Sequence, residues 1–424
     1  MKKRMMLSFA LLLVLTPLLV FGQGAKQEQV GEKTVLNFWT WRPENVEFYD
    51  GLIKAFQAEN PDIEIVQTAI KNTEYNTVLA AALQGGSGPD IFMGRSYGGL
   101  LTYSQSGYLE PVEKWLPEVT TWSKGALGGA TDPNTGVIYG LPAIGNTMFC
   151  IYNKKMYEEL GLQVPKTWNE FIGNLERMKA AGITPLANGG KDGWCLEAML
   201  GAVGPSFYGG DEFFSEVVEG KTNFLDPRFK TAVSKMYELI PYMPDMFMGV
   251  SYTDMQANFV NELAGHFLGG SFEASTFKKM NPDIEFDIFA VPGEKESDPR
   301  YVSVYADMNF AMNAASKNME ATAKFLRYLS TVEVGNKYIN DLKMVSWTPG
   351  TDASKNEFIQ KVLELQKEGS AQYLFLVGFR YEQPTGSSLF QAAAQGYLAG
   401  TLTLDECVKQ VQDGIATYYK PFQK

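Results

Sequence analysis

An alternation of apolar runs and helical stripes after residue 33 restricts the fold of this chain more than any other feature. The run VLNFWTW is typical of a buried strand, and an amphipathic helix follows it, with its inward positions at Tyr49, Leu52, Ile53 and Phe56. Further strands are predicted at 63–66 and 91–93, with a helical stripe over 75–83 between them. This order predicts an α/β fold with a largely parallel sheet, which binds ligands beyond the carboxyl ends of its strands.

A second block of the same kind begins near Met148, with the strand MFCIYN, the short helix KKMYEELGL and the later strand ITPLA. Capping boxes that would open helices are predicted from three spacings, Thr167-x-x-Glu170, Thr253-x-x-Gln256 and Thr403-x-x-Glu406. The segment YADMNFAMN predicts another strand. We therefore expect two α/β lobes that share short crossings, with no flexible linker.

The first residues have the pattern of a secretory signal peptide, predicted here as residues 1–24. Positive charge in MKKRMM is followed by the apolar run LSFALLLVLTPLLVF and by small residues in VFGQGA. The apolar run is shorter than the ~20 residues of a membrane-spanning helix. Because no cysteine follows it, a lipoprotein anchor has no attachment point, and we expect an exported, periplasmic protein.

Charge and composition argue against several classes of function. The formal net charge of −11 disfavours nucleic acid and anionic membrane partners. One histidine, His266, and three cysteines, Cys150, Cys195 and Cys407, match no metal site or catalytic triad, so no metal and no cofactor is expected. The cysteines are interpreted as small buried hydrophobic residues, with a single disulfide left open as the alternative.

An ordered set of motifs covers nearly all of the chain after the signal peptide and resembles one known family. The motifs are LNFWTW with LIKAFQAENPDIEI, GPDIFMGRSYGGLLTYSQSGYLEPV, GVIYGLPAIGNTMFCIYNKKMYEELGLQVPKTWNEF, AGHFLGGSFEASTF, MNFAMNAASKN with ATAKFLRYLS, and YLAGTLTLDECVKQ. The set resembles the extracellular solute-binding proteins of bacterial carbohydrate ABC importers, a group typified by maltose binders.

The resemblance implies a periplasmic-binding-protein fold, in which two lobes close around a carbohydrate like a hinged clamp. The N-terminal lobe would hold residues 33–142 and 300–348, and the C-terminal lobe residues 143–299 and 349–424. The protein would act as a monomer without catalysis and would deliver its ligand to the transmembrane subunits of an ABC permease.

Aromatic side chains are the first candidates for a sugar site, because sugars present apolar C–H faces ringed by hydroxyl groups. Trp39 and Trp41 end the first predicted strand, and strand alternation would send both to one face, so core packing and ligand contact are equal alternatives for the pair. Trp194 follows glycines in the predicted loop NGGKDGW. It is the strongest single candidate, and the resemblance implies a stacking aromatic residue in this region.

Other candidates follow later strands or lie at predicted crossings between the lobes. Phe272 and Glu273 come after the predicted strand HFL, and a helix N-terminus with an acidic residue is the alternative reading for Glu273. Tyr305 and Asp307 lie before FAMN, where hinge packing is an equal alternative to ligand contact. Trp347 lies at another crossing with the same two alternatives.

Three charged residues complete the predicted site. Arg95 comes directly after IFMG, where the resemblance implies a polar ligand residue that is acidic in maltose binders. An arginine there indicates a different hydroxyl pattern or an acidic group on the sugar, and a surface arginine paired with a carboxylate is the alternative. Glu44 could accept from hydroxyl groups or simply occupy a helix N-terminal turn. Arg380 is a weaker candidate.

Two other classes of function compete with a sugar receptor. A secreted glycoside hydrolase would also use an aromatic cleft with a pair of carboxylates, although no acid or nucleophile motif is recognisable in the sequence. A binding protein for another solute, such as an amino acid, a peptide or ferric ion, is the third class. A peptide binder would be compatible with this fold, whereas iron would call for clustered Tyr, His and carboxylate side chains. The aromatic residues predicted at strand ends and in loops favour sugar.

Overall fold

The computed structural model describes residues 33–423, so the predicted signal peptide at 1–24 lies outside the described residues. The strands are β1 (Thr34–Thr40), β2 (Ile63–Ala69), β3 (Ile91–Arg95), β4 (Leu109–Glu110), β5 (Gly140–Asn153), β6 (Thr184–Leu186), β7 (Ala264–Gly270), β8 (Phe286–Phe289), β9 (Val302–Asn313), β10 (Val345–Ser346) and β11 (Ser370–Gln372).

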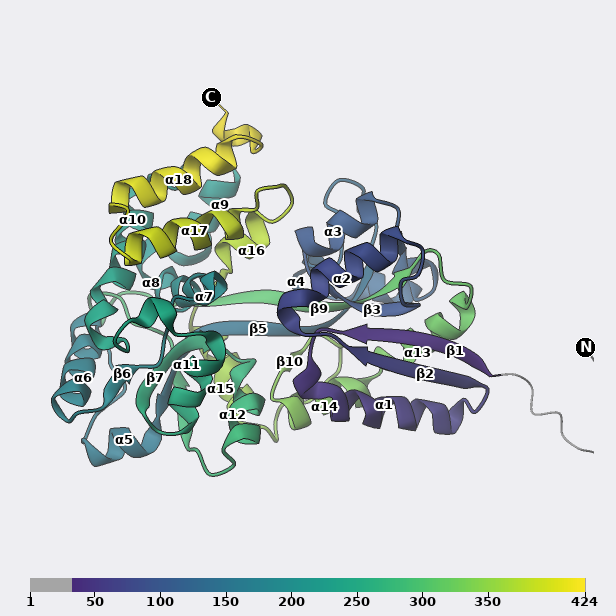
Figure 1. Ribbon diagram of the computed structural model, residues 1–424, viewed down its shortest axis with the longest axis horizontal. Coiled ribbons are helices and arrows are strands. Elements are labelled where there is room, and N and C mark those ends of the chain that lie inside the picture. The colour runs from purple at the N-terminus through teal and green to yellow at the C-terminus, as the bar shows by residue number, and fades with distance from the viewer. Residues whose placement is uncertain (1–32, 424) are drawn as a thin grey trace, which may run out of the picture.

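Helices cover both faces of the sheet and form the outer layers (Figure 1). The α-helices are α1 (Val46–Glu59), α2 (Asn72–Gln84), α3 (Gly98–Gln105), α4 (Lys124–Gly128), α5 (Lys154–Glu159), α6 (Trp168–Ala180), α7 (Gly193–Val203), α8 (Pro205–Tyr208), α9 (Gly210–Val218), α10 (Pro227–Glu238), α11 (Tyr252–Val260), α12 (Glu273–Met280), α13 (Met319–Leu329), α14 (Val332–Leu342), α15 (Glu357–Glu368), α16 (Leu374–Gly378), α17 (Gly386–Leu398) and α18 (Leu404–Ala416).

The strands form one mixed sheet whose main order is β2-β1-β3-β9-β5-β7-β6. Strands β1, β2 and β3 are parallel to one another, as are β6 and β7. Strands β9 and β5 pair antiparallel with each other, and β9 is also antiparallel to β3 and β5 to β7, while the short β11 lies parallel to β9. The expectation of a largely parallel sheet is therefore wrong. The α/β class is confirmed, since helices flank a large sheet.

Two long strands, β5 and β9, run through both halves of the molecule (Figure 1). The N-terminal half is built around β1, β2 and β3, and the C-terminal half around β6, β7 and α7. The pairing of β5 with β9 skips Ala143 on one strand and Asp307 on the other. Such bulges bend a strand and re-aim a side chain, and here they occur side by side where the chain passes between the halves.

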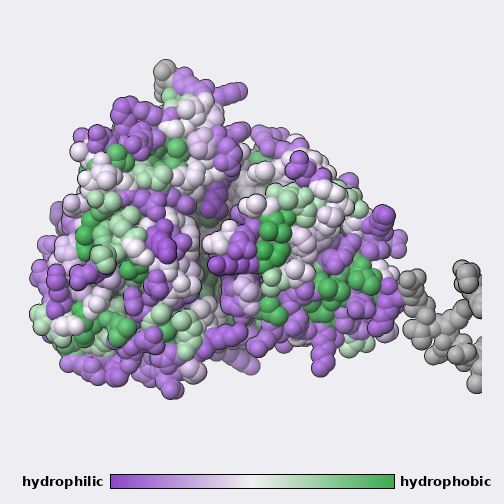
Figure 2. All heavy atoms as spheres, viewed as in Figure 1, coloured by the Kyte–Doolittle hydropathy of each residue, from purple (hydrophilic) through white to green (hydrophobic). Residues whose placement is uncertain are grey.

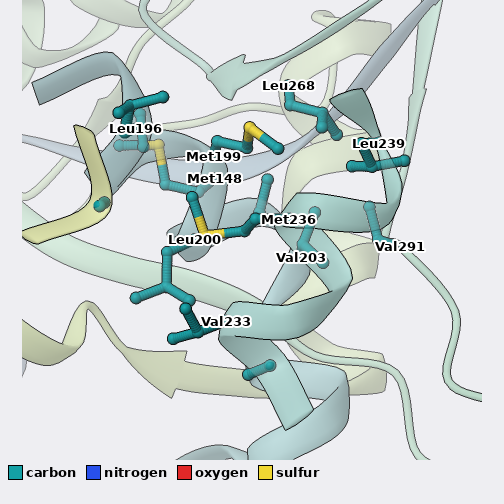
Figure 3. Packing of buried hydrophobic residues seen from close by; sticks show 14 of the residues in the cluster. Met148, Leu196, Met199, Leu200, Val203, Val233, Met236, Leu239, Leu268 and Val291 are labelled. Atoms are coloured by element: carbon teal, nitrogen blue, oxygen red, sulfur yellow. The ribbon is translucent and has the colours of Figure 1, made fainter. Parts of the chain in front are cut away.

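Each half has its own buried apolar core. In the N-terminal half, the core draws on β1, β3 and α1 and also on α13 and α14, which come from much later in the chain. In the C-terminal half, α7 and α10 pack their apolar side chains onto β5 and β7, and Figure 3 shows Met148 among residues of α7 and α10. A smaller cluster lies under α11 and α12.

Of the three predicted capping boxes, one is formed, one is half formed and one is wrong. Thr403 and Glu406 form the predicted capping box of α18. Thr167 accepts from the backbone N–H of Glu170 at the start of α6, but the Glu170 carboxylate accepts from the N–H of Lys166, so the box is only half formed. The predicted box at Thr253 is wrong, because α11 is capped two residues earlier, by Ser251 with Asp254.

The three cysteines are buried and free, as the preferred reading of the sequence predicted. Burial raises the pKa of each thiol, which is the behaviour of small packed side chains and not of reactive ones. Within residues 33–423, no helix has both the length and the apolar character needed to cross a membrane.

Candidate ligand-binding site

A cavity of about 1140 Å³ lies between the two halves. Its walls come from the carboxyl ends of β1 and β3 and from α2 on one side, and from α7, α11, α16 and α17 on the other. Figure 2 shows the groove between the halves, with hydrophilic residues at its mouth. The predicted site residues that line it are Trp41, Glu44, Arg95, Trp194, Phe272, Tyr305, Asp307 and Arg380.

Trp41 lines the cavity, whereas Trp39 does not. The two residues were expected to share one face of a strand, but β1 ends at Thr40 and Trp41 lies beyond the pleat. Trp39 stays partly buried against the N-terminal core. Trp41 is 4% exposed and packs edge-on against Tyr75, with ring centroids 5.5 Å apart. The expectation of a common environment for the two tryptophans is therefore wrong.

The floor of the cavity holds an ion pair between the buried Arg42 and the partly buried Asp307. The Asp307 bulge of β9 brings its carboxylate within 2.5 Å of Nη2 of Arg42, which is 7% exposed. Burial alone would lower the pKa of Arg42, but the negative charges of Asp307 and Glu44 hold that pKa above its usual value. Glu44 itself is exposed at the rim, 3.8 Å from Arg42.

Arg95 is held on the N-terminal wall without an acidic partner. Its Nε donates to Oδ1 of Asn76 at 3.0 Å, its Nη2 donates to Oδ1 of Asn72, and its guanidinium lies 4.6 Å from the centre of the Trp41 ring. Burial lowers the pKa of Arg95 to about 10; Asp307 opposes that change, whereas the nearby charge of Arg380 adds to it. The predicted alternative of an arginine paired with a carboxylate does not apply, because no ion pair within residues 33–423 includes Arg95.

The C-terminal wall carries a group of three aromatic rings. Trp194, predicted in a loop, is instead the second residue of α7. It packs edge-on against Tyr252 at 4.6 Å between centroids and lies 6.5 Å from Phe272. Trp194 is only partly buried, so part of its ring remains available to the cavity that it lines.

Glu273 lies behind this aromatic wall and does not line the cavity. It is the first residue of α12, as the alternative reading proposed, and is 0% exposed. Its Oε2 accepts from Gln256 at 2.8 Å, while its Oε1 has no partner within the described residues. Burial raises the pKa of this carboxyl group to about 7. The prediction that it contacts ligand is not supported by this position.

A cluster of hydrogen-bonded polar side chains lies where α7 meets α17. Arg380 donates through Nε to Oγ of Ser387 at 3.1 Å, and that hydroxyl donates to Oε1 of Glu197 at 2.8 Å. Gln391 donates to the other oxygen of Glu197, which is 2% exposed. The charge of Arg380 is thus linked to a buried carboxylate through one hydroxyl group.

Trp347 lies at the crossing between the halves and not in the cavity. Its backbone N–H donates to the carbonyl of Ala143 at 3.0 Å. A Cβ placed on Gly145 would lie 2.9 Å from atoms of the Trp347 ring, so the ring covers the glycine face of β5. Of the two sequence readings for Trp347, this position favours hinge packing.

Several cavity residues were not predicted. Tyr252 and Tyr373 are aromatic lining residues with no distinctive sequence signal, and Tyr373 packs on Tyr305 with centroids 5.1 Å apart. Arg42 could have been found, because it follows the first strand just as Trp41 does. Glu197 also carries a signal, as the one charge in the otherwise apolar helix GWCLEAMLGAV.

The cavity therefore combines flat apolar surfaces with many hydrogen-bonding groups, which suits a polyhydroxylated ligand. The aromatic side chains that line it are Trp41, Tyr75, Tyr103, Trp194, Tyr252, Phe272, Tyr305 and Tyr373. Among the residues that the structure describes, no group of three or more His, Cys, Asp or Glu side chains is placed to hold a metal ion.

The family model "Bacterial extracellular solute-binding protein" matches residues 42–336. A "multiple sugar-binding protein" of Streptococcus mutans is 27% identical over 345 residues, which cover 79% of this chain and 80% of the relative.

Solved structures show the same fold. A chitin oligosaccharide binding protein superposes with a TM-score of 0.78 over 92% of this chain and 100% of its own, at 22% identity. The GacH receptor of Streptomyces glaucescens, described unliganded and with acarbose, superposes with a TM-score of 0.74 over 92% of this chain and 99% of its own, at 19% identity.

Proposed function

Because this chain belongs to the family of bacterial extracellular solute-binding proteins, we propose that it captures an oligosaccharide in the cleft and delivers it to an ABC permease. The observation that carries the proposal is the concentration of eight aromatic side chains, interleaved with amide and charged groups, around one cavity between the halves. The names of the similar proteins, which refer to sugar and chitin oligosaccharide, support the same ligand class.

The size of the cavity supports an oligosaccharide over a single sugar ring. Its volume of about 1140 Å³ exceeds the usual range of about 300–1,000 Å³ for pockets that hold drug-sized ligands. Aromatic rings line both walls, so several sugar units could stack along the cleft while their hydroxyl groups bond to residues such as Asp307 and Gln391.

Ligand capture would proceed by closure of two lobes, with the boundaries expected from the sequence, 33–142 with 300–348 and 143–299 with 349–424. The side-by-side bulges at Ala143 and Asp307, with Trp347 packed over Gly145, support a hinge at this crossing. A ligand that touches both walls favours the closed form, because contacts to both walls exist only there.

We also propose that the protein is exported and acts as a monomer in the periplasm. The family is extracellular, which supports export, and the sequence of the first 24 residues supports a cleaved signal peptide. A permease of the same transport system would be the partner that receives the sugar.

The experiment is a thermal unfolding series on the mature chain, residues 25–424, with neutral and acidic mono-, di- and oligosaccharides, amino acids and short peptides. Ligand at about 100 times its dissociation constant stabilises by about 2.7 kcal/mol, which raises Tm by a few degrees for a chain of this size. We expect a shift with one class of oligosaccharide, recovered intact after incubation.

Two outcomes would contradict the proposal. A shift with peptides or amino acids alone would assign another solute to the cleft. Recovery of a cleaved glycan would instead indicate a glycoside hydrolase, the alternative raised by the carboxylates of the cleft.

A further inference from the structure

The charges that line the cleft are unevenly partnered. Five cationic side chains and four carboxylates line the cavity, so the cations outnumber the carboxylates by one. Arg42 is paired with Asp307, and Arg380 is linked to Glu197 through the hydroxyl group of Ser387. The two lysines, Lys71 and Lys191, are exposed.

Arg95 differs from the other two arginines of the cleft, because neither an ion pair nor a bridging hydroxyl group joins it to a carboxylate. Asn72 and Asn76, one helical turn apart on α2, accept from one edge of its guanidinium group, and the ring of Trp41 lies against it. Within residues 33–423, neither Arg95 nor Arg380 forms an ion pair. An arginine taken partly out of water and given only amide oxygens is costly, unless an anion arrives to compensate its charge.

The geometry also fixes the guanidinium in advance of binding. Two amide oxygens and an aromatic ring hold its orientation, and Arg95 lines the cavity. A planar guanidinium that is held in this way matches a carboxylate with two parallel N–H donors. A neutral sugar would give hydroxyl groups to the same donors but would leave the charge uncompensated.

We propose that Arg95 binds the carboxylate of a uronate unit, so that the ligand of the cleft is an acidic oligosaccharide; this inference rests on the proposed function. A singly charged carboxylate matches the excess of one cation along the cavity. A phosphate monoester carries about −1.5 to −2 at neutral pH, which is more than this excess of one positive charge.

The test compares matched pairs of ligands on the mature chain by isothermal titration calorimetry. The probes are di- and trisaccharides of galacturonate and of glucuronate, the carboxyl-reduced neutral form of each, and phosphorylated and sulfated disaccharides. We expect at least one uronate saccharide to bind about tenfold to a hundredfold more tightly than its reduced form, with an affinity that falls as NaCl rises.

Variants then assign that preference to one residue. Arg95→Gln should lose the preference for the acidic over the reduced form and the salt dependence of that preference. Arg95→Lys keeps the positive charge but loses the two parallel N–H donors of the guanidinium group, so it should keep only part of the preference for the acidic form. Arg177→Gln is the matched control, because Arg177 is an exposed arginine on α6 that does not line the cavity. Thermal unfolding without ligand checks that each variant is folded.

The outcomes separate this inference from the function on which it rests. Equal or tighter binding of the reduced saccharides, or no binding by any uronate probe, would overturn the acidic ligand while leaving a neutral-sugar receptor in place. Tighter binding of a phosphorylated or sulfated sugar would overturn the carboxylate assignment. Binding of peptides or amino acids, and of no saccharide, would overturn the proposed function itself.

Discussion

The guanidinium group of Arg42 donates to the carboxylate of Asp307 across 2.5 Å, although the two residues lie 265 positions apart in the chain. Arg42 follows the first strand of the N-terminal half, and Asp307 lies on β9 where that strand bulges between the halves. The pair therefore joins the floor of the cleft to the proposed hinge.

Asp307→Asn should destabilise the protein, because it leaves the charge of Arg42 buried without its partner. We expect a loss of about 2–3 kcal/mol in the free energy of unfolding, less than for a fully enclosed pair, since the Asp307 side chain keeps 15% exposure. Urea unfolding would measure it. Glu296→Gln, which breaks the exposed pair of Glu296 with Lys166, is the control and should change nothing measurable. Equal effects of the two variants would contradict the role of burial.

Trp194→Ala should weaken ligand binding by about tenfold or more without unfolding the protein, because it removes one aromatic face of the cleft. Calorimetric titration with whichever saccharide shifts Tm would measure the change. Trp115→Ala is the matched control, because Trp115 packs against the N-terminal core and does not line the cavity. Unchanged affinity in Trp194→Ala would remove this residue from the site.

Gly145→Ala should destabilise the crossing by about 1–3 kcal/mol, since the added methyl group would lie 2.9 Å from the Trp347 ring and would force it to move. Gly51→Ala is the contrasting case. Gly51 lies within α1, and a methyl group added there would meet open space, so alanine should stabilise the helix by about 0.5–1 kcal/mol. Urea midpoints of the two variants should therefore shift in opposite directions, and a stabilising Gly145→Ala would contradict the packing.

His266 should make the fold sensitive to acid. It is fully buried between the hydroxyl group of Tyr157, 2.7 Å from Nε2, and the carbonyl of Pro185, 2.9 Å from Nδ1, and burial lowers its pKa to about 4. Its contribution to stability is present above pH 6.5 and is lost as the pH falls towards 4, up to about 3 kcal/mol. Urea unfolding of His266→Gln across this range should show a smaller acid loss than the unsubstituted protein; an identical pH profile would contradict the buried neutral ring.

Glu273 should have the opposite effect of pH on stability, making the fold less stable as the pH rises. Because burial raises its pKa to about 7, folding favours the protonated carboxyl group. Its contribution is greatest below pH 4.5 and is lost as the pH rises through 7, up to about 3 kcal/mol. Glu273→Gln keeps an oxygen for the amide of Gln256, so it should be more stable than the unsubstituted protein at pH 8 and similar at pH 4.5. A variant that is less stable at pH 8 would show that the carboxylate is favoured in the fold.

Local patterns predicted those parts of the fold that depend on neighbouring residues. The periodic apolar positions of α1 and the capping box of α18 at Thr403 were found because both signals lie within a few residues. The parallel direction of β1, β2 and β3 agrees with the predicted order, but the antiparallel direction of β9 was not predicted, because β9 pairs with β3 and β5 across long separations in sequence. No local pattern shows that MFCIYN is only the end of a strand that begins at Gly140.

The same dependence on local patterns explains why only part of the site was predicted. Arg95 and Phe272 could be placed because residues that follow strands gather at one edge of a sheet. Trp39 and Trp41 were wrongly given a common face because the sequence does not show that β1 stops at Thr40. The direction of the Asp307 side chain depends on a bulge, which arises from pairing between distant strands. Its role as a ligand residue, like that of the other cavity residues, stays a prediction.

The position of β9 in the sheet has a consequence for how the chain can be made. Strand β3 ends at Arg95 and pairs with the earlier strand β1 on one side, yet its neighbour on the other side, β9, begins only at Val302. At about 5–20 residues per second, roughly 200 residues of further synthesis separate the two, which takes on the order of 10–40 s. During that time one edge of β3 has no partner strand, so a ribosome-bound fragment cannot complete the sheet of the N-terminal half. The order of synthesis thus keeps the emerging polypeptide incompletely folded, and a chain released before β9 would expose that edge to aggregation.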